Sequence, residues 1–189
     1  MPALTLTLGN VYIYTNHDLE SFDLSALETV KGSIIVTNNI VLPTFTFPSV
    51  VSVGLEAPDA ALGGNIYVTG NELLTDFALP ALYEIGDFLE VNSNVLLATI
   101  DAPTMFTIGK GLRVINNPSL TSWTFDALAW VGTNVRVEYN SAFPQCLAEA
   151  LVTAIESKGA LGGEFHSTGN QAGCTCEQSG ETWEASCPD

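Results

Sequence analysis

One asparagine recurs along most of this chain at a nearly constant spacing, and this repeat restricts the fold more than any other feature. Its copies are Asn16, Asn39, Asn71, Asn94, Asn117 and Asn140. All intervals but one are about 23 residues long, and repetition at a fixed period is the sequence signature of stacked-repeat architectures. The interval from Asn39 to Asn71 contains nine extra residues around Gly54–Gly63, which predicts a loop there.

Apolar residues occupy fixed positions around each asparagine. Leu89 and Val91 precede Asn94 by five and three positions, Leu97 follows it by three, and Ile100 by six. Alternating apolar residues indicate a strand with one buried face, and each repeat has room for three such strands. Stacked in register, the repeats predict an all-β fold, a right-handed parallel β-solenoid with coils of about 23 residues.

The recurring asparagine is predicted to stand at a turn after the first strand. Asparagine tolerates left-handed backbone conformations, and its side-chain amide can bond the backbone of the next coil. We therefore expect the asparagines to form a structural ladder rather than a binding site.

The two ends of the chain depart from the repeat. Residues 1–8 hold the alternating Leu4, Leu6 and Leu8, which predict a lead-in strand that covers the open end of a solenoid spanning 9–143. At the other end, residues 144–189 are expected to form a cap. It comprises a helix over 145–157 ending at Gly159, a last strand near 162–170 and a cysteine-rich tail.

All four cysteines lie in this C-terminal cap, at Cys146, Cys174, Cys176 and Cys187. An even number of clustered cysteines predicts two disulfides and an oxidising compartment. Cys174 and Cys176 are too close to pair with each other, so 146–174 with 176–187 and 146–176 with 174–187 both remain open. A four-thiolate zinc site is a less favoured alternative because a second close cysteine pair is missing.

Composition excludes several classes of function. The formal net charge is −16 with only five basic residues, which argues against nucleic acid and anionic membrane surfaces as partners. No apolar run reaches the roughly 20 residues of a membrane span. The N-terminus lacks the basic and apolar regions of a signal peptide. We expect either that a leader was removed or that the chain is one domain of a longer protein.

The repeat Gly-x-apolar-x-apolar-x-x-Asn-x-x-Leu, followed by an aromatic residue, Pro-x-Leu and x-x-apolar-Gly, is clearest over Gly86–Val131 and extends over about 9–155. It resembles the receptor L-domain superfamily, the leucine-rich-repeat-like β-helices of insulin and epidermal growth factor receptors. The resemblance is closest to fungal cell-wall and bacterial surface proteins with such repeats. It implies a secreted or cell-surface protein with a non-catalytic recognition role.

No motif for catalysis, a metal or a cofactor stands out, and we predict none. Asp76 and Asp101 lie on neighbouring coils of the second strand face, where they could form a glycosidase-like carboxylate pair or a weak calcium site. A solvated face is the favoured interpretation. Paired Thr44 and Thr46 resemble ice-binding rows, but the other coils do not continue the pattern.

The outward face of the first strands is the preferred binding surface. Its two columns mix aromatic, apolar and charged side chains, a composition suited to a protein or glycan partner. The candidate residues are Tyr12, Tyr14, Ile35, Tyr67, Glu90, Asn92, Arg113, Ile115 and Arg136. The simpler interpretation is ordinary cross-strand pairing, such as Arg113 with Glu90. A structural subunit of a surface assembly and a polysaccharide-acting enzyme are the alternatives.

Overall fold

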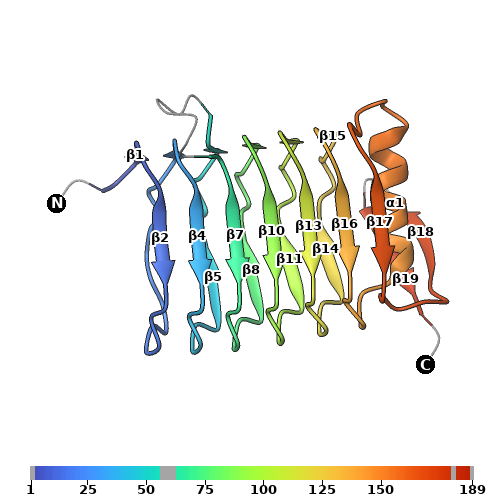
Figure 1. Ribbon diagram of the computed structural model, residues 1–189, viewed down its shortest axis with the longest axis horizontal. Helices are drawn as coiled ribbons and strands as arrows, with labels where there is room; N and C mark the ends of the chain where they lie inside the picture. Colours follow the sequence, from blue (N-terminus) through green and yellow to red (C-terminus); the bar gives the residue numbers. More distant parts are fainter. Residues whose placement is uncertain (1–2, 56–62, 180–181, 188–189) are drawn as a thin grey trace.

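The computed structural model describes residues 3–55, 63–179 and 182–187, and in these ranges the chain is mostly β with one helix (Figure 1). The loop predicted from the nine extra residues falls largely on 56–62, outside the described residues. Each repeat contributes strands to parallel sheets that run along the length of the molecule, so that equivalent segments lie side by side (Figure 1).

The largest sheet contains the first strand of each repeat. Leu89 lies opposite Ile66 on one side and Leu112 on the other, which is the register that the columns predict. The first and third residues of the inner strands point inward and the others outward, as strand geometry requires. Its strands are β2 (Val11–Tyr14), β4 (Ile34–Thr37), β7 (Ile66–Thr69), β10 (Leu89–Asn92), β13 (Leu112–Ile115), β16 (Val135–Glu138) and β17 (Phe165–Thr168).

Two further parallel sheets hold the second and third strands of the repeats. The second sheet is β5 (Thr44–Thr46), β8 (Asp76–Ala78), β11 (Thr99–Asp101) and β14 (Ser122–Thr124). The third is β1 (Leu6–Thr7), β3 (Thr29–Val30), β6 (Ser52–Val53), β9 (Glu84–Ile85), β12 (Thr107–Ile108) and β15 (Trp130–Val131). Inward side chains from all three sheets form one continuous apolar core, in which Phe45 and Phe77 stack with ring centroids 5.2 Å apart.

The asparagine ladder is present as predicted. Asn71 donates its backbone N–H to Asn94 Oδ1 at 3.0 Å, and its side-chain amide donates to the carbonyl oxygen of Val36 at 2.9 Å. The pattern recurs from Asn39 to Asn140, and Asn140 donates its backbone N–H to Asn170 Oδ1. These amides are buried and water does not reach them, so the ladder hydrogen bonds provide the partners that buried polar groups need.

The predicted left-handed conformation of the ladder asparagines is wrong by one position. Positive φ angles occur at the residue before each one, for example 54° at Asn38 and 58° at Ser93. The ladder asparagine must aim its side chain along the stack, so the preceding residue makes the turn. Glycine is needed at a different place, because a Cβ on Gly109 would overlap the carbonyl oxygen of Gly86 in the adjacent repeat.

The N-terminal strand does not cover the end of the stack. Strand β1 pairs with β3 and extends the third sheet by one strand. Leu4, Leu6 and Leu8 are all exposed. The predicted lead-in strand is present as β1, but it lies at the end of the third sheet alone and leaves its leucines exposed rather than packed across the end of the stack.

The C-terminal end is covered. Helix α1 (Gln145–Glu156) buries Leu147, Leu151 and Ile155, whereas Ala154 is only half-buried. Gly159 adopts a positive φ of 65° just beyond the helix. Such a conformation is expected of a glycine at a C-terminal helix stop. The chain then returns as β17, the last strand of the first sheet.

The tail folds as an antiparallel hairpin, which the sequence did not predict. Strands β18 (Thr175–Ser179) and β19 (Thr182–Ser186) pair with each other and pack against α1. The disulfides are Cys146–Cys176 and Cys174–Cys187, the second of the two connectivities left open by the sequence. One bond ties the hairpin to the helix and the other closes the hairpin.

Candidate binding surfaces

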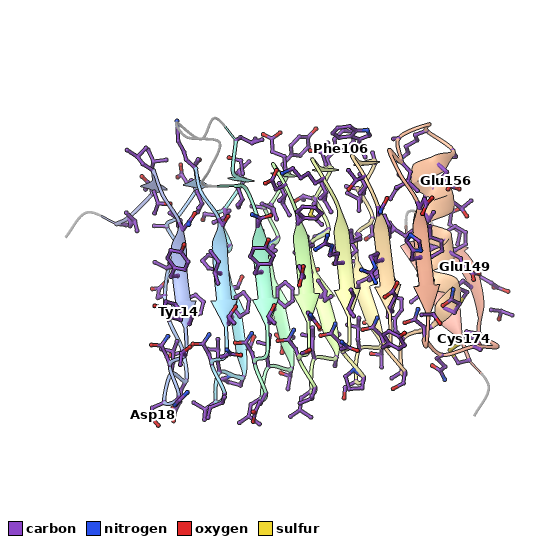
Figure 2. All side chains as sticks on the ribbon, viewed as in Figure 1. Tyr14, Asp18, Phe106, Glu149, Glu156 and Cys174 are labelled. Carbon is purple, nitrogen blue, oxygen red and sulfur yellow. A yellow bond between two sulfur atoms is a disulfide. The ribbon has the colours of Figure 1, made fainter. Side chains whose placement is uncertain are left out.

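The outward residues of the seven-stranded sheet form what we call the first-strand surface. The structure places all nine predicted residues on it: Tyr12, Tyr14, Ile35, Tyr67, Glu90, Asn92, Arg113, Ile115 and Arg136. Parallel pairing aligns them in two columns, because Tyr12 lies opposite Ile35 and Ile35 opposite Tyr67. Figure 2 shows Tyr14 near one end of this surface.

The N-terminal part of the surface is aromatic. Tyr12 and Tyr14 are 59% and 60% exposed, and their rings meet edge to face with centroids 6.0 Å apart. The Tyr12 hydroxyl accepts a hydrogen bond of 2.6 Å from the amide of Asn10. Tyrosines of this kind offer an apolar ring and a polar tip to a partner.

The middle of the surface carries cations paired with carboxylates. Arg113 donates to Glu90 at 3.2 Å, which confirms the predicted cross-strand pair, and its guanidinium lies 4.4 Å from the ring centroid of Phe88. At the border of the surface, Lys110 just before β13 pairs with Asp87 just before β10 at 2.9 Å. Stacking on an aromatic ring and pairing with a carboxylate together hold the arginine in place.

The C-terminal part continues this charge balance. Arg136 donates to Glu138 on its own strand at 2.7 Å, and His166 lies 3.2 Å from Glu164. The hydrogen bonds to Glu138 raise the pKa of Arg136 above its ordinary value. Two of the five basic residues, Arg113 and Arg136, therefore lie on this surface beside carboxylates, in a chain of net charge −16. A third, Lys110, borders the surface just before β13.

Tyr67 stands where the aromatic and charged parts meet. Its side chain is half-buried between Ile35 and Glu90 of the neighbouring strands. Burial raises the pKa of the Tyr67 phenol above its ordinary value, and the nearby charge of Glu90 adds to the effect.

The carboxylates considered for catalysis lie on the second sheet. Asp76 accepts hydrogen bonds from Thr44 at 2.7 Å and Thr75 at 2.8 Å, and Asp101 accepts one from Thr124. Parallel pairing sets Asp101 opposite Ala78 and Asp76 opposite Thr99, so the two aspartates are offset along adjacent strands. Across the described ranges, no group of three or more histidine, cysteine or acidic residues is placed to hold a metal ion.

A groove that the sequence did not predict lies beside the C-terminal helix. Its volume is about 660 Å³, and it is lined by residues from the second sheet, α1 and the hairpin, including Trp123, Phe125, Leu151 and Trp183. The groove forms only because the hairpin packs against α1, and no repeat in the sequence predicts that packing. An aromatic residue such as Phe106 outside the inward columns is the one sequence feature that hints at it.

An exposed aromatic pair adjoins this groove. Tyr83 and Phe106 are both exposed, and their rings stack with centroids 5.3 Å apart. Phe106 also lines the groove. Figure 2 places Phe106 at the upper edge of the stack, apart from Tyr14 on the first-strand surface.

Comparisons with family models, with curated proteins and with solved structures returned no match. Among the described helices, none has the length and apolar character needed to cross a membrane. The two disulfides are typical of an oxidising, extracellular environment.

Proposed function

We propose that the three parallel sheets close into a right-handed β-solenoid of the receptor L-domain type. The in-register pairing of equivalent strands from successive repeats supports a continuous winding of the chain. Connections between parallel strands are right-handed in nearly all proteins. The sequence pattern over Gly86–Val131 is the link to the L-domain family.

The proposed function is non-catalytic recognition of a protein or glycan at the cell surface or in the extracellular space. One observation carries the proposal: the first-strand surface joins exposed tyrosines to neutralised ion pairs while the chain as a whole is strongly acidic. Desolvation costs least where charges are already paired and aromatic side chains supply contact area. The disulfides support a secreted or surface location.

A glycan-array and cell-binding screen tests this proposal. The Tyr12→Ala/Tyr67→Ala/Arg113→Ala variant removes the aromatic and cationic contacts of the first-strand surface. We expect it to lose at least tenfold in affinity, because aromatic and arginine side chains dominate interface energies. Tyr83→Ala is the matched control, since Tyr83 is an exposed tyrosine outside the first-strand surface.

Both variants must keep the melting temperature of the wild type for the comparison to hold. Binding retained by the triple variant but lost in Tyr83→Ala would show that the partner binds around Tyr83 and not on the first-strand surface. Absence of any binding by the wild type would contradict recognition.

A structural subunit is the second candidate, and the uncovered N-terminal end favours it. The outer edge of β1 lies at the margin of its sheet, and exposed sheet edges pair readily with other chains. Sedimentation over a range of concentrations distinguishes the two: a subunit assembles through this end, and Leu6→Lys weakens the assembly. A monomer at all concentrations would exclude it.

A further inference from the structure

Hydrogen bonds between neighbouring repeats run in one direction: the earlier repeat donates and the later repeat accepts. In the third repeat, the carbonyl oxygens of Asn65 and Thr69 and the Oδ1 atom of Asn71 accept backbone N–H groups of the repeat before, at 2.8, 3.0 and 3.0 Å. The same contacts recur at the following junctions. Each repeat therefore presents fixed acceptors to the repeat that precedes it.

The first repeat has these acceptors too, but no described residue donates to them. They are the carbonyl oxygens of Asn10 and Tyr14 and the Oδ1 atom of Asn16. Strand β2 is the last strand of its sheet, so these atoms and the N–H groups of Tyr12 and Tyr14 lie along an open edge (Figure 1). An open strand edge is a template for pairing with another chain.

The apolar core is also uncovered at this end. Val11, Ile13 and Phe22 pack against the core but are only half-buried, whereas Phe77 in an inner repeat is buried. The Phe45 ring lies between Phe22 and Phe77, at centroid distances of 5.8 and 5.2 Å. The Phe22 ring has such a neighbour on one side only. One more stacked repeat would cover these side chains.

Acidic side chains at this end indicate the charge of a partner. Asp18 and Glu20 are exposed and follow Asn16 by two and four positions, and Figure 2 shows Asp18 at the N-terminal end of the stack. The equivalent places in the inner repeats hold uncharged residues: Val41 and Pro43, Leu73 and Thr75, Leu96 and Ala98, and Ser119 and Thr121. Because stacked repeats set equivalent places opposite each other, basic residues there in a partner would complement the two carboxylates.

A second copy of this chain does not supply the missing repeat. The N–H donors would come from its C-terminal end, which α1 closes. Gln145 Oε1 accepts hydrogen bonds from Asn170 Nδ2 at 3.0 Å and from Ser167 Oγ at 2.7 Å, and so takes the part of a next ladder asparagine. The N-terminal end of a second copy carries the same acceptors and the same acidic residues, which repel each other.

We propose that the N-terminal end binds a repeat of the same pattern from a different chain, with basic residues two and four positions after its ladder asparagine. The incoming strand pairs in parallel with β2 and donates backbone N–H groups to the carbonyl oxygens of Asn10 and Tyr14. Its ladder asparagine donates to Asn16 Oδ1. The contact is made end-on with another chain, so it depends neither on recognition by the first-strand surface nor on self-assembly.

The test measures fluorescence anisotropy of a labelled peptide that has the pattern of one repeat and lysine at the places opposite Asp18 and Glu20. Salt of about 150 mM screens long-range attraction. A matched peptide is N-methylated at its first strand residue and at the residue before its asparagine, which removes two N–H donors. We expect N-methylation to weaken binding by about tenfold, because each lost hydrogen bond costs several-fold.

Variants of the chain test the acceptor and the carboxylates separately. Asn16→Ala should weaken peptide binding by about two- to tenfold, and Asp18→Asn/Glu20→Gln by about two- to fivefold. Glu156→Gln/Glu164→Gln is the matched control, since it removes two exposed carboxylates at the opposite end and should leave binding unchanged. Equal weakening by the control pair would show general attraction to an acidic protein and would overturn the proposal.

Hydrogen exchange locates the bound peptide. Protection should rise at the N–H groups of Tyr12 and Tyr14 and not in β17, and protection of β17 alone would overturn the proposal. Equal binding of the N-methylated peptide would exclude strand pairing. Self-association of the wild type that excludes the peptide would overturn the assignment to a different chain.

One further variant keeps this inference separate from the proposed function. Tyr67→Ala/Arg113→Ala alters the first-strand surface away from the N-terminal end and should bind the repeat peptide as the wild type does. Loss of glycan or cell binding in this variant therefore concerns the first-strand surface alone. Loss of peptide binding in it would overturn the end-on contact.

Discussion

The repeat that begins at β2 and the repeat that begins at β10 follow one sequence pattern but differ in burial. Asn94 is fully buried and its side chain is bonded on both sides, whereas Asn16 is exposed and its side-chain amide donates to Asn39 Oδ1. The inward Val91 is buried, while the equivalent Ile13 is only half-buried. Repeats that share one sequence pattern are therefore not equally buried.

The reason is that a stacked repeat buries its core against its two neighbours. The first repeat has a neighbour on one side only, and β1 extends one sheet without covering the end. At the opposite end, α1 and the disulfide-bonded hairpin replace the missing neighbour. We therefore expect the middle repeats and the C-terminal end to resist unfolding more strongly than the first repeat.

The largest expected effect contrasts two phenylalanines of one column. Phe77→Ala removes a buried ring from the middle of the stack and should lower the free energy of unfolding by about 3–5 kcal/mol. Phe22→Ala should cost less than half as much, because Phe22 is already half-exposed. Urea unfolding of both variants measures the difference, and equal losses would contradict the contrast between the repeats.

The next effect concerns the covered end. Removal of Cys146–Cys176 in a Cys146→Ala/Cys176→Ala variant should cost about 2–4 kcal/mol, since the bond closes the longer loop and ties the hairpin to α1. Removal of Cys174–Cys187, which closes a shorter loop, is the control and should cost less. Hydrogen exchange should then rise in α1 and not in β7. Uniform loss of protection would show that the end cap and the repeats unfold as one unit.

The ladder asparagines provide a smaller contrast. Asn94→Ala leaves the Val68 carbonyl and the Asn71 N–H without their buried partners and should cost about 1–3 kcal/mol. Asn16→Ala should have only the small effect of an ordinary surface substitution, because water reaches that site. Thermal unfolding of the pair gives the comparison. A large loss in Asn16→Ala would mean that the first repeat is as tightly held as the middle.

Periodic features of this fold could be predicted from the sequence, and features of single occurrence could not. The inward columns and the asparagine ladder recur in several repeats, so an atypical residue in one repeat does not change the prediction for the rest. The hairpin of β18 and β19 occurs once and is fixed by disulfides whose pairing the spacing left open. The path of β1 could not be predicted, because alternation indicates a strand but not its neighbour.

The same distinction holds for the candidate surfaces. Outward columns follow from the strand period, so the nine residues of the first-strand surface could be grouped in advance. The groove joins Trp123, Leu151 and Trp183 from three elements that no repeat relates. The left-handed residue before each ladder asparagine also escaped prediction, because Asn38, Gly70 and Ser93 share no side-chain type.

The smallest predicted effect lies on the first-strand surface and concerns the pKa of Tyr67, in the middle of the sheet. The Tyr67 phenol should titrate above pH 10.0, because burial and Glu90 disfavour the phenolate. The stability contribution of this raised pKa is present below the unfolded-state pKa and is lost as the pH rises through the folded-state pKa. Absorbance titration of the wild type minus Tyr67→Phe isolates this residue.

Two carboxylate variants separate the causes of the raised Tyr67 pKa. Glu90→Gln should lower the Tyr67 pKa, because it removes the neighbouring negative charge. Asp76→Asn, on another sheet, should leave the Tyr67 pKa unchanged. A Tyr67 pKa that is not raised in the wild type would show that the middle strands are as open to water as the first, and the contrast between the repeats would then not extend to the outward face of the sheet.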